Sequence, residues 1–169
     1  MIIGVPKEIK NNENRVGLIP SGVYALTKLN NTVLIEKNAG LNSGYSDELY
    51  IEAGATIIDS AKEVYKRSEM IIKVKEPQES EFELLQENQI LFTYLHLAPD
   101  YKQAKALLDK KVSAIAYETV QKEDKALPLL APMSEIAGKM SVQIGATLLQ
   151  KNNEGKGVLL GGVSGVLPA

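Results

Sequence analysis

Four polar side chains of this 169-residue chain have types that suit acid–base and electrostatic chemistry, and each follows a different short apolar run: Arg15, Lys75, His96 and Glu118. A guanidinium binds a carboxylate through two hydrogen bonds at once, which lysine cannot match. A partly desolvated lysine polarises a carbonyl oxygen, and histidine exchanges protons near neutral pH. If the runs are parallel strands, their ends bring these four side chains to one edge of the sheet, where they could serve a common site.

Each of the four side chains also has a purely structural interpretation. Arg15 could tether its loop through a salt bridge, and Lys75 could be an edge lysine whose ammonium reaches solvent. His96 could be a satisfied turn histidine. Glu118 could hold Lys75 or a backbone amide. Lys73 precedes Lys75 by two residues, which places both on one face of an extended strand.

The elements that must position these residues alternate between apolar β-branched runs and helical patterns. Strands are expected at Ile2–Val5, Thr32–Glu36, Ala55–Ile58, Met70–Val74, Ile90–Leu95 and Val112–Tyr117. Helices are expected at Ser21–Leu29, Asp47–Ala53, Ser60–Lys66, Ser80–Gln86 and Tyr101–Lys111, with start signals at Asp59 and Asp100. Strands that are apolar at nearly every position are buried on both faces. The pattern predicts an α/β fold, a parallel sheet flanked by helices that is Rossmann-like or flavodoxin-like.

The pattern changes after residue 117. A connector leads to an expected long helix, Pro132–Gln150, with an apolar stripe at helical spacing. Its first turn offers N–H groups suited to an anion, and Ser134 could cap the helix or contact a ligand. Val158–Leu160 could begin a further strand. The last residues, GGVSGVLPA, lack the G-x-G-x-x-G spacing of a dinucleotide fingerprint.

Composition excludes several classes of function. The chain has no cysteine and one histidine, which excludes disulfide scaffolds, zinc fingers, thiol nucleophiles and two-imidazole sites, so no metal site is expected. A net charge of −2 with 5% aromatic residues argues against a nucleic-acid surface. We see no apolar run long enough to span a membrane and no signal peptide. A cytoplasmic protein with no nucleic-acid or membrane partner is therefore expected.

Six motifs in order resemble the N-terminal half of alanine dehydrogenases. They are GVPKEIKNNENRVGLIPSGV, VLIEKNAGLNSGYSDELY, IKVKEP, LFTYLHLA, AYETVQ and APMSEIAGKMSVQIGA, and they cover essentially the whole chain. The resemblance implies that Arg15 grips the substrate carboxylate, that Lys75 contacts a substrate oxygen, and that His96 is the catalytic acid/base. It also implies that Met133 and Ser134 lie beside a nicotinamide cofactor.

The implied reaction is the reversible oxidative deamination of L-alanine to pyruvate and ammonia with NAD. The resemblance implies a substrate-binding domain, 1–129, left incomplete, followed by a linker helix and the truncated start of an NAD-binding domain, 130–169. Family members are about twice as long and are homo-oligomers. Because the nucleotide fingerprint is missing, we expect the chain alone to be inactive.

Two other interpretations remain open. The chain resembles, less closely, the N-terminal segment of a nicotinamide nucleotide transhydrogenase subunit, which needs no acid/base histidine here. It could also be a non-catalytic remnant or assembly module, because the apolar stripe of the long helix would favour self-association.

Overall fold

The computed structural model describes residues 1–169, which form two compact units, Met1–Val120 and Gln121–Ala169. The strands are β1 Ile2–Val5, β2 Thr32–Glu36, β3 Thr56–Ile58, β4 Met70–Ile72, β5 Ile90–Thr93 and β6 Ser113–Ala116. The α-helices are α1 Pro20–Lys28, α2 Asp47–Glu52, α3 Ala61–Arg67, α4 Tyr101–Asp109 and α5 Ala131–Leu148. Short 3₁₀ helices are η1 Leu41–Ser43, η2 Glu79–Leu84, η3 Tyr117–Thr119 and η4 Lys151–Asn153.

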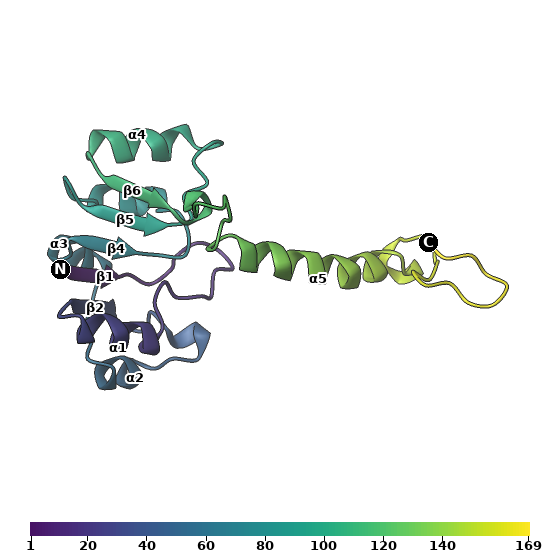
Figure 1. The fold of residues 1–169 in the computed structure, drawn as a ribbon, viewed down its shortest axis with the longest axis horizontal. Helices are drawn as coiled ribbons and strands as arrows, with labels where there is room; N and C mark the ends of the chain where they lie inside the picture. Colours follow the sequence, from purple (N-terminus) through teal and green to yellow (C-terminus); the bar gives the residue numbers. More distant parts are fainter. The chain divides into compact units, whose positions relative to one another are not determined.

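The first unit is built on one six-stranded sheet with the order β3-β2-β1-β4-β5-β6. Every neighbouring pair is parallel, so the expected α/β class is confirmed. The order is that of the Rossmann fold rather than the flavodoxin fold. Figure 1 shows β4 and β1 side by side in the middle of this sheet. Strand order reverses direction between them, and that position governs where a ligand binds.

Two apolar layers cover the two faces of the sheet because successive strand residues point to opposite sides. On one side, Val23 of α1 and Tyr50 of α2 pack with Val5 and Ile35. On the other side, α3, η2 and α4 pack against a second cluster: Leu34, Ile58, Val64, Tyr65, Ile71, Leu85, Leu91, Leu95 and Leu107. Both faces are thus closed by helices, which explains strands without polar alternation.

Several elements differ from the expected ones. The expected helix Ser80–Gln86 is a 3₁₀ helix, η2, in which Glu81 and Leu84, three residues apart, share the inward side. Ser60 rather than Asp59 caps α3, accepting from the Glu63 N–H at 3.4 Å, whereas Asp100 caps α4 as expected.

The second unit holds α5 and a turn-rich end. Its helix begins at Ala131 with no side-chain cap, so Ser134 does not cap it. The expected strand at Val158–Leu160 does not form. Residues near it form only an isolated antiparallel bridge between Val163 and Val166, and so short a pairing is marginal on its own.

Candidate functional site

A cleft of about 610 Å³ opens at the carboxyl end of the sheet in the first unit. Ligands of open α/β sheets bind at the point where strand order reverses, and here that point lies between β1 and β4. The cleft is lined by Asn14, Arg15, Val16, Gly17, Ile19, Asn42, Ser43, Tyr45, Lys73, Val74, Tyr94 and Tyr117. The loops after β1, β4, β5 and β6 therefore contribute to one cavity.

Arg15 lines this cleft and is held by Glu13. Its Nε and Nη2 donate to the two carboxylate oxygens of Glu13 at 2.8 and 2.6 Å. The Arg15 hydrogen bonds lower the pKa of the Glu13 carboxyl, so the pair is charged at neutral pH. This side-on pairing leaves the end-on edge of the guanidinium, one N–H from each Nη, for a second carboxylate. The loop salt bridge and a binding role are therefore compatible.

Gly17 lets the Arg15 loop pass against β4. A Cβ at residue 17 would lie 2.8 Å from the carbonyl oxygen of Ile72 and 3.0 Å from the Cα of Lys73. Both are backbone atoms that cannot swing away. The loop therefore rests directly on the end of the strand that leads to Lys75.

Changing Gly17 to alanine should move this loop off β4. We expect a loss of about 1–3 kcal/mol in the free energy of unfolding, the usual cost of overpacking, measured by urea denaturation. Gly138→Ala in α5 is the matched control, because a Cβ there meets no atom within 4 Å, and it should be neutral or slightly stabilising. Equal stabilities for the two variants would contradict the close approach at residue 17.

Lys75 follows β4 and is fixed through its backbone. Glu8 Oε1 accepts from the N–H groups of Val74 and Lys75 at 2.6 and 3.3 Å. The Thr93 hydroxyl donates to the Lys75 carbonyl oxygen at 2.8 Å. Lys75 is partly exposed, and its charge lies close enough to Glu13 to help lower the pKa of that carboxyl, which places the Lys75 ammonium near Arg15.

Lys73 does not share the environment of Lys75. The strand ends at Ile72, so Lys73 and Lys75 do not lie on one face of an extended strand as expected. Lys73 is completely buried. Its Nζ lies 2.8 Å from Glu81 and 3.3 Å from Glu8. Burial raises the pKa of Glu8, partly offset by Lys73 and by the two backbone N–H groups. Burial beside Glu81 raises the pKa of Tyr65, whose hydroxyl donates to Glu81 at 3.0 Å.

His96 follows β5 with an exposed side chain, and Glu118 accepts its backbone N–H at 2.7 Å. Glu118 thus holds a backbone amide, one of the two structural roles considered for it. Neither His96 nor Lys75 lines the cleft itself, whereas their neighbours Tyr94 and Val74 do.

Aromatic rings form one wall of the cleft. The Tyr117 ring packs edge-to-face with Tyr94 at 4.9 Å and with Phe92 at 4.3 Å between centroids. Burial raises the pKa of Tyr117, so its hydroxyl stays protonated at neutral pH. The wall therefore consists of two packed tyrosine rings that carry phenolic hydroxyls.

Met133 and Ser134 lie in the first turn of α5, in the second unit. Their N–H groups already donate to the Leu130 carbonyl oxygen at 3.1 and 3.2 Å. The helix start therefore does not present these amides to a phosphate.

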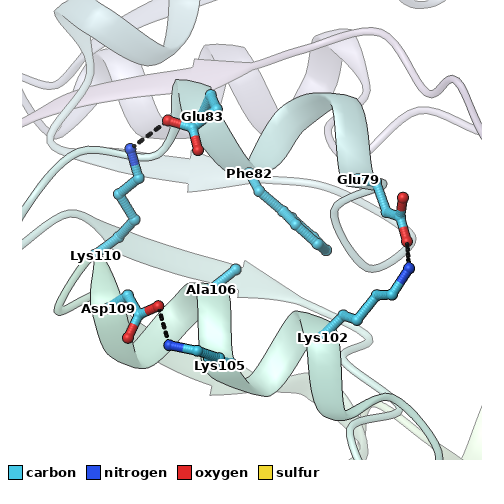
Figure 2. Close-up of a pocket in the computed structure, with 8 residues that line it drawn as sticks. All are labelled: Glu79, Phe82, Glu83, Lys102, Lys105, Ala106, Asp109 and Lys110. Carbon is cyan, nitrogen blue, oxygen red and sulfur yellow. Dashed lines mark hydrogen bonds and ion pairs between the residues drawn. The ribbon is translucent and has the colours of Figure 1, made fainter.

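A second cavity, of about 400 Å³, lies between η2 and α4. Figure 2 shows Phe82 reaching between these elements, with ion pairs around it. Lys102 pairs with Glu79 at 2.7 Å, Lys110 with Glu83 at 3.0 Å, and Lys105 with Asp109 at 2.6 Å along α4. Because its charges are mutually paired, this cavity is a weaker candidate than the cleft at the β1–β4 boundary.

The sequence gives little sign of the carboxylates that support the site, Glu8, Glu13 and Glu81. For Glu8 and Glu81 one sequence feature could have pointed to burial, because each is an acidic residue close to an apolar run. No group of three or more potential ligand side chains is placed to hold a metal ion. No helix combines the length and apolarity that a membrane span needs.

Comparisons with known proteins relate the chain to sequences and structures that are already described. Residues 4–137 match the family described as alanine dehydrogenase/PNT, N-terminal domain. An alanine dehydrogenase of Methanococcus maripaludis is 65% identical over the whole chain, and one of Staphylococcus saprophyticus is 60% identical over 98% of it. The chain spans 45% and 44% of these relatives.

Solved structures give the same result. A structure described as L-alanine dehydrogenase superposes with a TM-score of 0.89 at 53% identity, covering all of this chain and 46% of that one. A transhydrogenase from Sinorhizobium meliloti superposes with a TM-score of 0.66 at 26% identity, covering 70% of this chain and 34% of that one.

Proposed function

The chain belongs to the family of the alanine dehydrogenase/PNT N-terminal domain, and from this membership we propose that it is the substrate-binding portion of an L-alanine dehydrogenase. The reaction is the reversible, NAD-dependent conversion of L-alanine to pyruvate and ammonia. One observation carries the proposal: Arg15 stands in the cleft, held side-on by Glu13, with its end-on edge available to a carboxylate.

Three side chains have separate roles in binding and converting the substrate. Arg15 binds the carboxylate and so aligns the substrate. Lys75 stabilises negative charge that develops on the substrate oxygen. His96 exchanges a proton with the reacting group, because imidazole works as both acid and base near neutral pH. The aromatic wall of Tyr94 and Tyr117 limits the size of the side chain on the substrate.

A complete NAD site is not supported by this chain. It has no G-x-G-x-x-G run, and the amides of Met133 and Ser134 are already bonded within the helix. We propose that Met133 and Ser134 line the edge of the cofactor through their side chains. The division at residues 129 and 130, a homo-oligomeric longer form and a cytoplasmic location belong to the same proposal.

The transhydrogenase interpretation has weaker support. Identity is 60–65% to the two alanine dehydrogenases and 26% to the transhydrogenase. The chain also carries His96, which a protein without a small organic substrate does not need.

The proposal can be tested on the chain itself, because His96 is its only histidine and gives a single imidazole Hε1 signal in proton NMR. At constant pH, pyruvate should displace this signal in a saturable way. Pyruvamide, which has no carboxylate, should not do so at the same concentrations. A His96 signal that ignores pyruvate, or that responds equally to both compounds, would overturn the proposed function.

A further inference from the structure

His96 has an unusual backbone for a residue with a side chain. Its φ of 47° lies in the left-handed region, which costs a non-glycine residue about 1 kcal/mol or more. Such conformations persist where the surrounding structure fixes them. The contacts that fix this residue therefore decide where its imidazole lies.

Glu118 supplies two of those contacts from η3, 22 positions further along the chain. Its Oε1 accepts from the N–H groups of Leu95 at 3.1 Å and His96 at 2.7 Å, and Oε2 lies 3.2 Å from the Leu95 nitrogen. Two successive N–H groups that converge on one anion form a nest, a concavity made for negative charge.

The same peptide is held on its other side. The Leu95 carbonyl oxygen accepts from the side-chain amide of Gln103 at 2.9 Å, and Gln103 is completely buried. The Leu95–His96 peptide therefore has its C=O bound by Gln103 and its N–H bound by Glu118. A peptide fixed at both polar atoms cannot rotate without breaking a hydrogen bond.

We propose that Glu118 is a positioning residue whose carboxylate fixes the left-handed backbone of His96 and so aims the imidazole at the bound acid. The proposal rests on the proposed function, because it takes proton exchange with the substrate as the task of His96. A carboxylate suits this role because both of its oxygens lie within 3.2 Å of the Leu95 nitrogen while Oε1 also accepts from His96, so the negative charge faces both donors. An amide oxygen could accept from both N–H groups but carries no charge, and its NH2 group would face the donor that Oε2 now faces.

Glu8 plays a comparable structural part at the neighbouring strand end. It accepts from the N–H groups of Val74 and Lys75 as Glu118 accepts from those of Leu95 and His96. The parallel supports a shared device, in which a glutamate distant in sequence holds the first residues after a strand. Glu118 is the better test because Glu8 also belongs to the buried cluster with Lys73.

The test compares Glu118→Gln with the wild-type chain by NMR, with Glu123→Gln, an exposed glutamate of the connector, as the control. In the variant, the backbone amide signal of His96 should move upfield, because it no longer donates to a full carboxylate. The pyruvate-induced displacement of the imidazole signal should fall to less than half. The pyruvate Kd, read from the Arg15 Nε–H signal, should stay within about threefold. A variant that is only destabilised would change the imidazole displacement and the pyruvate Kd together.

Other outcomes discriminate between the two proposals. An unchanged His96 amide signal and an unchanged imidazole displacement in Glu118→Gln would overturn the positioning role alone. A wild-type chain whose imidazole ignores pyruvate would overturn the proposed function instead, and the positioning role with it. Glu118→Asp keeps the charge on a shorter arm and should restore part of the displacement, which also keeps the test decisive if Glu118→Gln folds poorly.

Discussion

Replacing Lys73 with methionine should lower the free energy of unfolding of the Met1–Val120 unit by about 3–5 kcal/mol. The change removes the ammonium that lies 2.8 Å from Glu81 and 3.3 Å from Glu8. Both carboxylates stay buried. A buried charge without an opposite charge beside it lowers the stability of the folded state. Urea denaturation followed by circular dichroism measures the loss.

Two further variants separate the ion pairs from simple packing. Lys105→Met removes an exposed pair with Asp109 on α4 and should cost about 0.5 kcal/mol or less. Combining Lys73→Met with Glu8→Gln and Glu81→Gln leaves no charge in the cluster and should recover at least half of the loss. If Lys73→Met costs no more than Lys105→Met, the cluster does not hold the fold together.

Changing Arg15 to alanine should weaken pyruvate binding about 30-fold, equivalent to about 2 kcal/mol. The variant removes the end-on edge that we assign to the substrate carboxylate, and Glu13, whose side chain is 7% exposed, loses its guanidinium partner. Arg15→Lys should fall between wild type and alanine, because one ammonium cannot pair bidentately with two carboxylates. The His96 imidazole signal, followed during a pyruvate titration, gives the Kd.

Arg67 provides the matched control, because it is the other arginine of the chain and lies at the exposed end of α3. Arg67→Ala should leave the pyruvate Kd unchanged. An Arg15→Ala variant that binds pyruvate as tightly as Arg67→Ala would show that Arg15 serves only to tether its loop.

Much of the fold was accessible from the sequence because burial on both faces leaves a plain signal. The runs at Ile2–Val5 and Thr32–Glu36 are apolar almost throughout, and their predicted bounds agree with β1 and β2. Bounds were less accurate where the strand ends in the site. The predicted strand Met70–Val74 stops at Ile72, because Glu8 takes the Val74 N–H that a longer strand would use for pairing.

The candidate site was accessible only in part, for a physical reason. Arg15, Lys75 and His96 could be singled out because their types are informative directly after apolar runs. The glutamates that hold these residues could not be singled out, because their contacts join distant parts of the sequence: Glu8 and Val74 are 66 positions apart. No local sequence spacing predicts such a contact. The roles of the three residues themselves stay predictions for the experiments above.

The central place of β1 in the sheet has a consequence for synthesis on the ribosome. β1 pairs with β2 on one side, but its other partner, β4, begins only at Met70. At about 5–20 residues per second, the emerging chain spends several seconds with one edge of β1 unpaired. An unpaired strand edge can form hydrogen bonds with a non-native segment. In the folded unit the Arg15 loop packs against the end of β4 at Gly17. Until β4 has been made, this loop lacks the strand against which it packs. The cleft at the β1–β4 boundary is thus completed late in translation, although its first residues are made early.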